Sequence, residues 1–249
     1  MSDIAKLRAA DSQPVLDCLE KIDTASRHLA ALVDDVLDMS KIENDKLQLT
    51  PQIVSLHSII FSTLDILQPL AEKKGVLLQR KVNVADCSVY ADSRRLQQIM
   101  VNLGANAVKF TAKDKKVVLK CDMLGQDDES MLVRFVLEDE GIGIKESNRQ
   151  CIFEAFNQGG RSTDAFYGGT GLGLAISQKL AHMMGSEIKL VSTFGVGSRF
   201  WFDLRLAKAS FLQQTFVTDE IDLHGYRLLV VEDCLLYTSP SPRDSTSSR

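Results

Sequence analysis

The sequence predicts an α+β fold preceded by one long helix, and two patterns indicate this. Residues 14–43 repeat apolar side chains at three- and four-residue steps, which is typical of an amphipathic helix. The chain after it mixes shorter helical stretches with alternating apolar and polar stretches that end at turn residues, as strands do. The 249 residues are 45% hydrophobic and 25% charged, an ordinary globular composition that allows one or two domains.

Charge and cysteine content exclude several classes of protein. The net charge is −4, and the cluster Lys113, Lys115 and Lys116 is typical of a solvated turn, so we expect no nucleic-acid partner. The absence of a signal peptide and of a membrane-length apolar run predicts no membrane segment here and a cytoplasmic location, which leaves open a membrane-anchored parent protein. Five scattered cysteines without a CxxC pair indicate reduced thiols.

The long helix at 14–43 carries more apolar surface than one helix can bury. Its stripe includes Leu29, Leu32 and Val36, with acidic and basic residues between them. Such a stripe needs a second helix or a partner chain, as in a bundle. The alternative is a core helix of the following domain. The polar run from Asn44 to Pro51 ends the helix in either case.

Four elements are expected between this helix and residue 91. In order they are an edge strand at 47–54, a helix at 56–74 and strands at 76–84 and 87–91. Pro51 cannot donate to a sheet ladder, so it favours an edge position for the first strand. Gly75 marks the end of the helix. The expected apolar face of this helix comprises Leu56, Ile59, Ile60, Leu64, Leu67 and Leu70.

The next helix carries polar groups with a regular spacing. Asp92 is expected to cap it, and it runs to about Phe110. Asn102, Asn106 and Lys109 lie at i, i+4 and i+7 and therefore project from one side. Amide oxygens suit a hard divalent cation, and the ammonium suits phosphate. The alternative is a solvent-facing side with accidental spacing.

Two strands, at 116–123 and 131–138, are predicted next, joined by a polar loop. The second leads into Asp139, Gly141 and Gly143. A carboxylate at the end of a buried strand, beside glycines, can accept a hydrogen bond from an exocyclic amine such as that of adenine. An ordinary exit from strand to turn is the alternative.

A glycine-rich loop at 168–174 is the most unusual stretch of the chain. Residues 145–152 are expected to be helical, and the polar stretch 157–167 before the loop is expected to be a mobile lid. Glycines at 169, 171 and 173 then lead into a helix at 172–184, whose N-terminal N–H groups favour an anion such as phosphate. The alternative is a plain flexible loop. Strands at 187–192 and 198–206 flank a glycine hairpin at 195–197.

Five separated segments together resemble the conserved boxes of sensor histidine kinases. Residues 102–111 resemble the N box, 139–143 the G1 box, 152–156 the F box, 168–174 the G2 box, and 195–198 the final glycine motif. The order and spacing match over roughly residues 45–207. The resemblance implies a two-layer α/β sandwich of the Bergerat type, which binds ATP under a flexible lid. It also implies transfer of the ATP γ-phosphoryl group to a histidine, mostly by positioning and charge stabilisation.

The resemblance also assigns roles to individual residues. Asn106 is implied to be the Mg²⁺ ligand, Asn102 and Lys109 contact phosphate, and Asp139 reads the adenine amino group. Phe153 and Phe156 support the lid. The implied ATP-binding set is Asn102, Asn106, Lys109, Asp139, Gly141, Gly143, Phe153, Gly169, Thr170, Gly171, Leu172 and Gly173.

Two other functions share this fold or these motifs. Related ATPases of the gyrase, chaperone and mismatch-repair type place a Glu one helical turn before the metal-binding Asn to activate water. Asn102 occupies that position here, and an amide cannot take a proton at neutral pH, so transfer is favoured over hydrolysis. A non-enzymatic ATP-binding or dimerisation module remains the third alternative.

The phosphoacceptor histidine of the family is missing from this chain. None of His28, His57, His182 and His224 has the family's acidic-apolar-Arg-Thr-Pro context. Residues 1–46 resemble part of the dimerisation and histidine-phosphotransfer hairpin, which implies a homodimer. The further expected segments are the ATP-binding domain at 47–207, a linker at 208–224, the start of a response-regulator receiver domain at 225–233, and a tail at 234–249 that resembles translated sequencing adapter. A receiver domain is therefore the expected partner.

Overall fold

The computed structural model describes residues 13–44, 46–149, 151–155 and 171–209. The expected lid at 157–167, together with Phe156, Gly169 and Thr170, lies outside these residues. The receiver strand at 225–233, the tail at 234–249 and nearly all of the expected linker lie outside them as well.

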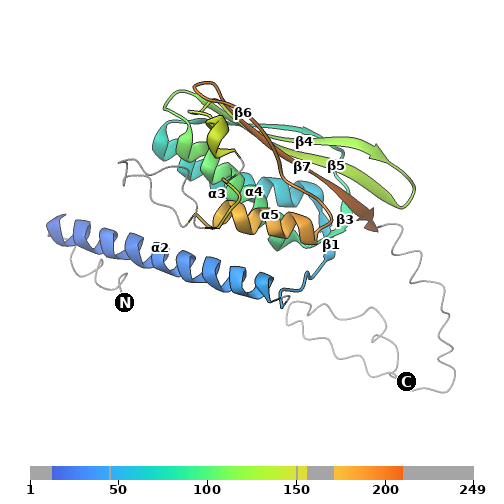
Figure 1. The fold of residues 1–249 in the computed structure, drawn as a ribbon, viewed down its shortest axis with the longest axis horizontal. Helices are drawn as coiled ribbons and strands as arrows, with labels where there is room; N and C mark the ends of the chain where they lie inside the picture. The colour runs from blue at the N-terminus through green and yellow to red at the C-terminus, as the bar shows by residue number, and fades with distance from the viewer. Residues whose placement is uncertain (1–12, 45, 150, 156–170, 210–249) are drawn as a thin grey trace, which may run out of the picture. The chain divides into compact units, whose positions relative to one another are not determined.

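The described strands form one mixed sheet (Figure 1). The strands are β1 (Gln52–Ser55), β2 (Leu77–Asn83), β3 (Ser88–Ala91), β4 (Lys116–Gln126), β5 (Ser130–Asp139), β6 (Lys189–Thr193) and β7 (Gly197–Lys208). Their order is β1-β3-β7-β5-β4-β2, and β6 pairs with the first half of β7. Only the β2–β4 pair is parallel among the pairings of these strands. The terminal position of β1 agrees with the edge strand expected from Pro51, although the strand begins after the proline.

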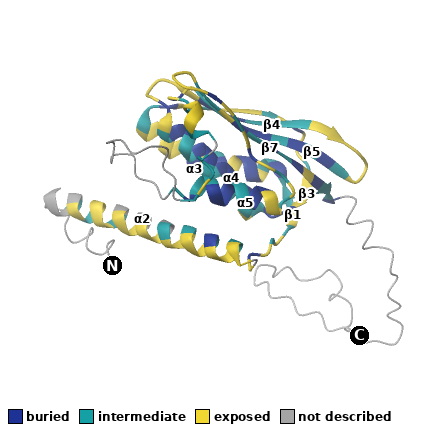
Figure 2. Cartoon of the chain, in the orientation of Figure 1, coloured by how far each residue is buried: buried dark blue, intermediate teal, exposed yellow. Residues whose placement is uncertain are grey.

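Three helices cover one face of this sheet, which confirms the predicted α+β sandwich (Figure 1). They are α3 (Leu56–Lys74), α4 (Ser93–Phe110) and α5 (Gly173–Met183). Buried side chains concentrate where the helices meet the sheet (Figure 2). In the centre, Phe135 of β5 stacks on Phe202 of β7 with ring centroids 5.1 Å apart. This apolar layer holds the helix ends in place against the strand ends.

Capping residues predicted from the sequence fix the ends of α3 and α4. The Asp92 carboxylate accepts a hydrogen bond from the Arg95 backbone N–H at 3.0 Å, and it also accepts one from the Thr50 N–H at 2.9 Å. Gly75 adopts the left-handed conformation, φ 71°, that ends α3. The bounds of α4, which carries the polar face, are therefore set by its own sequence.

Two details differ from the sequence-based expectation. Residues 145–152 do not form an α-helix; the structure has a single 3₁₀ turn, Glu146–Asn148. The Arg149 guanidinium donates to the Ser192 carbonyl at 2.6 Å, so a side-chain hydrogen bond connects this segment to β6. Leu70, expected on the apolar face of α3, is 46% exposed, and the smaller Ala71 is buried instead.

The long helix α2 (Gln13–Glu43) is present as expected, with much of its apolar stripe exposed. Leu29 is 62% exposed, and Val33, Val36 and Leu37 are each 50% exposed. Near its end Met39 is buried in the core of the domain. None of the helices in the described part of the chain is both long and apolar enough to span a membrane.

Candidate nucleotide-binding site

The polar face of α4 contacts the start of α5. The Asn102 amide nitrogen lies 3.3 Å from the Gly173 carbonyl oxygen and 3.2 Å from the Ser177 hydroxyl oxygen. Gly173 is the first residue of α5, so the helix that follows the glycine loop begins directly beside the α4 face. Asn106 lies one turn further along α4 and is half-buried. The amide face and the start of α5 therefore form one surface.

The glycine loop is described only in its last part. Gly171 has φ 69°, a conformation that disfavours every residue with a Cβ. Leu172 is buried and anchors the loop to the core, while Gly173 opens α5. Gly169 and Thr170 lie outside the described residues, so their predicted phosphate contacts stay predictions.

Asp139 lies at the end of β5 and is held by the loop that follows it. Its Oδ1 accepts a hydrogen bond from the Gly141 N–H at 2.9 Å. Burial raises the pKa of this carboxyl above its ordinary value, although hydrogen bonds from the Gly141 and Ser198 backbones act in the opposite direction. The position of Asp139 is therefore set by backbone donors, and its carboxylate remains an acceptor for an amine.

The glycines after Asp139 allow the loop to touch two other segments. A Cβ on Gly141 would lie 2.6 Å from the Phe110 carbonyl oxygen, and the next residue, Ile142, donates its N–H to that same oxygen at 3.2 Å. A Cβ on Gly143 would lie 2.1 Å from the Thr193 carbonyl oxygen. This loop thereby joins the end of α4 to the β6–β7 turn.

Two lysines lie at the C-terminal end of α4. Lys74 of α3 donates to the backbone carbonyls of Val108 and Lys109. The Lys109 ammonium lies 5.0 Å from the centre of the Phe110 ring. Burial lowers the pKa of both lysines, and the nearby charge of Lys74 lowers that of Lys109 further. Two ammonium groups therefore lie at this end of α4, partly withdrawn from water, and such groups suit an anion.

Phe153 packs under the site rather than facing open solvent. Its ring meets the Phe200 ring edge-on, with centroids 6.5 Å apart, and it packs against the main core. The segment that precedes residues 156–170 is thus anchored on β7. The neighbouring residue predicted for the same role, Phe156, lies outside the described residues.

Ser177 contacts the predicted site but was not singled out in the sequence. It is fully buried, and its hydroxyl meets Asn102. The available signal was a polar residue on the same face of α5 as the buried apolar residues Leu180 and Ala181. A hydroxyl at such a position needs a hydrogen-bond partner.

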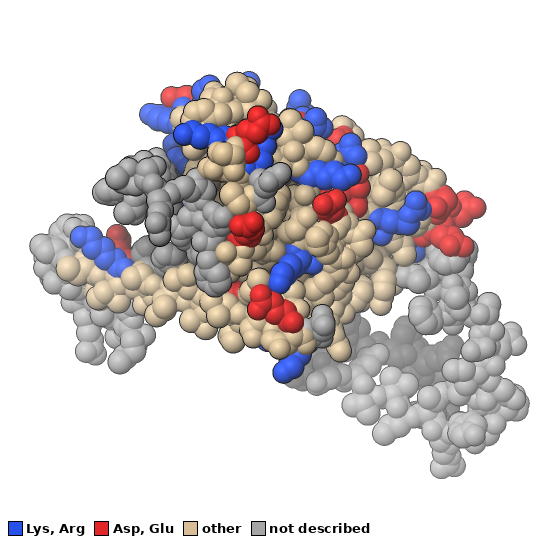
Figure 3. Space-filling view, viewed as in Figure 1, with Lys and Arg blue, Asp and Glu red and all other residues tan. Residues whose placement is uncertain are grey.

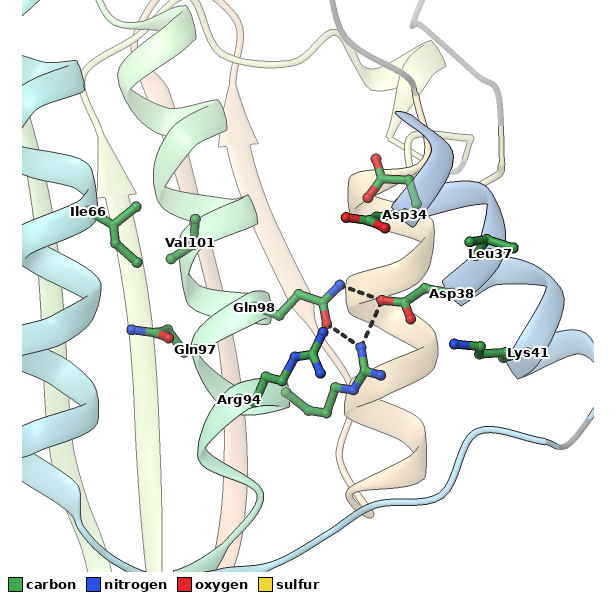
Figure 4. A pocket seen from close by; sticks show the side chains of 11 residues that line it. Asp34, Leu37, Asp38, Lys41, Ile66, Arg94, Gln97, Gln98 and Val101 are labelled. Carbon is green, nitrogen blue, oxygen red and sulfur yellow. Dashed lines mark hydrogen bonds and ion pairs between the residues drawn. The ribbon is translucent and has the colours of Figure 1, made fainter. Parts of the chain in front are cut away.

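A separate groove of about 400 Å³ lies between α2 and the α3–α4 face. Its lining residues are Asp34, Asp35, Leu37, Asp38, Lys41, Ile66, Arg94, Arg95, Gln97, Gln98 and Val101. Asp38 accepts hydrogen bonds from Arg95 at 2.7 Å and from Gln98 at 3.0 Å. The bond with Gln98 can be followed in Figure 4. None of the lining residues belongs to a glycine motif. This groove is therefore an α2–domain contact and not the nucleotide site.

Acidic and basic side chains are interspersed on the face seen in Figure 3. Among the ion pairs of the described residues, Arg134 lies 2.7 Å from Asp203 and Lys179 lies 3.6 Å from Glu43. Among the described residues visible on this face, there is no extended surface of one sign.

Comparison with known proteins identifies this arrangement. Residues 91–208 match the model of the family described as histidine kinase-, DNA gyrase B-, and HSP90-like ATPase. The matched segment contains α4, Asp139, the G1 loop and α5. The sensor histidine kinase GacS of Pseudomonas protegens is 38% identical over 194 residues, which are 78% of this chain and 21% of that protein. The matched segment is an ATPase domain of the kind that sensor histidine kinases carry.

Other histidine kinases agree with this assignment. The virulence sensor protein BvgS of Bordetella bronchiseptica is 33% identical over 94% of this chain and 19% of its own length. The crystal structure of full-length ShkA in complex with AMPPNP superposes with a TM-score of 0.66 and 30% identity, over 83% of this chain and 42% of that one. The chain spans about a fifth of the length of the curated histidine kinases it matches.

The histidine kinase fold also extends to a more distant solved structure. The Acinetobacter baumannii histidine kinase AdeS aligns at 18% identity with a TM-score of 0.55, over 80% of this chain and 90% of that one. At this identity the likeness concerns the fold alone. It supports the arrangement of sheet and helices on which the candidate site is built.

Proposed function

We propose that this chain is the ATP-binding catalytic part of a two-component sensor histidine kinase, which transfers the γ-phosphoryl group to a histidine. One observation carries the proposal. The start of α5 meets α4 at Asn102, while the loop after Asp139 meets the end of α4 at Phe110. Two segments distant in sequence therefore meet α4, each with the chemistry that one part of ATP requires.

The residues present fit ATP and Mg²⁺. Asp139 would accept the adenine amino hydrogen, and Lys109 and the N-terminal N–H groups of α5 would neutralise phosphate charge. The Asn106 amide oxygen is the kind of ligand a hard cation takes, alongside phosphate oxygens and water. When bound, Mg²⁺ supplies charge neutralisation on the phosphates.

Transfer is favoured over hydrolysis by the residue one turn before Asn106. A water-activating residue must accept a proton, and the Asn102 amide cannot do so at neutral pH. In the structure its amide nitrogen is also directed at two acceptors of α5. The protein groups therefore orient the donor and stabilise its charge, without providing a general base at that position.

The wider organisation expected from the sequence is proposed together with the function. Residues 1–46 would belong to the dimerisation hairpin, 47–207 to the catalytic domain, 208–224 to a linker and 225–233 to a receiver domain. The exposed stripe on α2 supports a second helix or a second copy as its cover. We propose a cytoplasmic location for this part and a response-regulator receiver domain as the phosphoryl partner.

The chain is expected to bind ATP without phosphorylating itself. The His57 Nε2 forms a hydrogen bond with the Val84 carbonyl oxygen at 2.8 Å, and exposed His182 contacts Gln178 at 3.2 Å. Neither has the sequence context of an acceptor.

Labelled ATP tests these points. We expect magnesium-dependent binding, no acid-labile phosphohistidine and no steady release of phosphate. Sustained hydrolysis would support the related ATPases instead, and failure to bind ATP would leave only a dimerisation module.

Glycine replacements test the location of the site. Gly173→Ala should keep the fold, because the added Cβ would lie 3.6 Å from Asn102, an ordinary contact distance. Together with Gly171→Ala it should abolish ATP binding by blocking close approach of phosphate. Gly125→Ala is the control, since its Cβ would meet nothing within 4 Å. Unchanged ATP affinity in the double variant would refute the assignment.

A further inference from the structure

The orientation of the Asn102 amide is fixed by chemistry. The Gly173 carbonyl oxygen can only accept a hydrogen bond, so the atom 3.3 Å from it must be the amide nitrogen. The same nitrogen also lies 3.2 Å from the Ser177 hydroxyl. Both amide hydrogens are therefore directed at α5, and neither is left for a phosphate oxygen.

The second partner, Ser177, has no exposed surface. A buried hydroxyl that loses its partner destabilises the folded state, so the contact with Asn102 satisfies a requirement of the core. Ser177 lies one helical turn after Gly173. The amide therefore bonds to two successive turns of α5 and restricts both the position and the rotation of this helix end.

We propose that Asn102 and Ser177 are positioning residues: together they hold the first turn of α5 against α4, and so place the described end of the glycine loop, residues 171–173, for a nucleoside triphosphate. This inference rests on the proposed function. The contact joins the start of α5, whose N–H groups would meet the phosphates, to α4, which carries Asn106 one turn after Asn102. Loss of the Asn102–Ser177 contact would let the start of α5 move relative to α4. Affinity for the phosphates would then fall, while binding of the adenine end at Asp139 would be unaffected.

The test compares two ligands on the full chain. Calorimetry measures the dissociation constants of AMPPNP with Mg²⁺ and of adenosine for the unsubstituted protein and for Ser177→Ala. We expect Ser177→Ala to weaken AMPPNP binding by about 3- to 10-fold, the net effect of one neutral hydrogen bond, with adenosine affinity unchanged. Amide hydrogen exchange in the first turns of α5 should become faster.

A matched control removes another fully buried hydroxyl. Thr63 of α3 donates to the Ile59 carbonyl at 2.7 Å, within its own helix. Thr63→Ala should lower thermal stability without changing the ratio of the two dissociation constants. Ser177→Thr, which keeps the hydroxyl, should restore AMPPNP affinity if it folds; its melting temperature shows whether it does.

A double-mutant cycle separates positioning from direct phosphate contact. Asn102→Ala and Ser177→Ala should be non-additive in AMPPNP affinity if they act through one contact. Additive effects, or unchanged AMPPNP affinity in Ser177→Ala, would overturn the inference while leaving the proposed function intact. If the unsubstituted protein binds neither ligand, the proposed function fails and this inference fails with it.

Discussion

Gly143 and Thr193 are in direct backbone contact, with room for no side chain between them: a Cβ on Gly143 would lie 2.1 Å from the Thr193 carbonyl oxygen. The left-handed conformation of Gly143, φ 64°, adds a second reason for glycine. The loop that follows Asp139 is thus seated on the β6–β7 turn by its own backbone.

Gly143→Ala should therefore destabilise the domain by more than the usual cost of placing alanine in the left-handed conformation. We expect a loss of about 2–4 kcal/mol, from backbone strain plus displacement of the Thr193 carbonyl. Gly185→Ala is the control, since Gly185 has φ 74° with open space around it, and it should cost only about 1–2 kcal/mol. Urea unfolding measures both; equal losses would show that the backbone contact contributes nothing.

Replacement of Asp139 should separate stability from nucleotide binding. Burial raises the pKa of Asp139 above 3.8, so the stability that its neutral form contributes is present below that value and is lost as pH rises through the folded-state pKa. Asp139→Asn stays neutral and should melt at a higher temperature at pH 7, with the advantage vanishing in acid. ATP affinity should fall at least roughly 10-fold, because a hydrogen bond to a charged acceptor is lost.

The pKa of Asp127 is shifted in the opposite direction from that of Asp139, so the two residues can be compared. Hydrogen bonds from Ser130 lower its pKa below 3.8, so its contribution is present above that value and is lost as pH falls through the folded-state pKa. Asp127→Asn should therefore lower the melting temperature at pH 7. A melting temperature for Asp139→Asn that also falls at pH 7 would contradict the role assigned to burial.

Gly104 of α4 is required for close packing with α3. A Cβ at this position would lie 2.3 Å from the Leu67 Cδ1 atom, and Leu67 is fully buried. Although Ala favours a helix by about 1 kcal/mol, Gly104→Ala should destabilise the protein by about 1–3 kcal/mol through overpacking. The double variant with Leu67→Val should recover part of this loss. Stabilisation by Gly104→Ala alone would show that Leu67 can move aside without cost.

The Asp38–Arg95 pair should couple α2 to the domain in a pH-dependent way. Burial raises the Asp38 pKa, but hydrogen bonds from Arg95 and Gln98 outweigh it and lower the pKa overall. The contribution is therefore present above pH 3.8 and is lost as pH falls through the folded-state pKa. A double-mutant cycle of Asp38→Asn and Arg95→Met should give a coupling of about 1 kcal/mol.

The more exposed pair Asp127–Arg205 is the control for this cycle. Their side chains are 57% and 66% exposed, against 15% and 12% for Asp38 and Arg95. Solvent should therefore screen the control pair more strongly, and its coupling should be smaller and vanish sooner with added salt. Equal couplings in the two cycles would argue against a specific α2–domain contact.

The spacing of residues predicted the helix bounds and the polar side of α4, because caps and periodicity are local properties. Asp92 caps the start of α4 and Gly75 ends α3, as their chemistry requires. What could not be predicted depends on packing between distant segments. The partners of the Asn102 amide become known only when α5 is placed against α4, and Ser177 enters the site for the same reason.

The glycines show the same division between local and tertiary information. The resemblance places Gly141 and Gly143 in the ATP-binding set, and in the structure an added Cβ at each would meet first the carbonyls of Phe110 and Thr193. Glycines in a motif indicate that the backbone lies close to another group, but which group that is depends on the tertiary fold. In the segment expected to be helical at 145–152, the described residues form only a 3₁₀ turn, and Arg149 bonds to the Ser192 carbonyl of β6.

The position of β7 has a consequence for synthesis of the chain. This strand lies between β3 and β5 in the sheet, yet it is the last of the described strands to be made, and Val89 of β3 pairs with Lys208. On the ribosome, β3 and β5 must wait with unpaired edges until residue 208 has left the exit tunnel. Nascent chains that end before β7 should therefore aggregate readily and be sensitive to proteases. As the chain is lengthened through β7, the domain should change from unfolded to folded over these few residues.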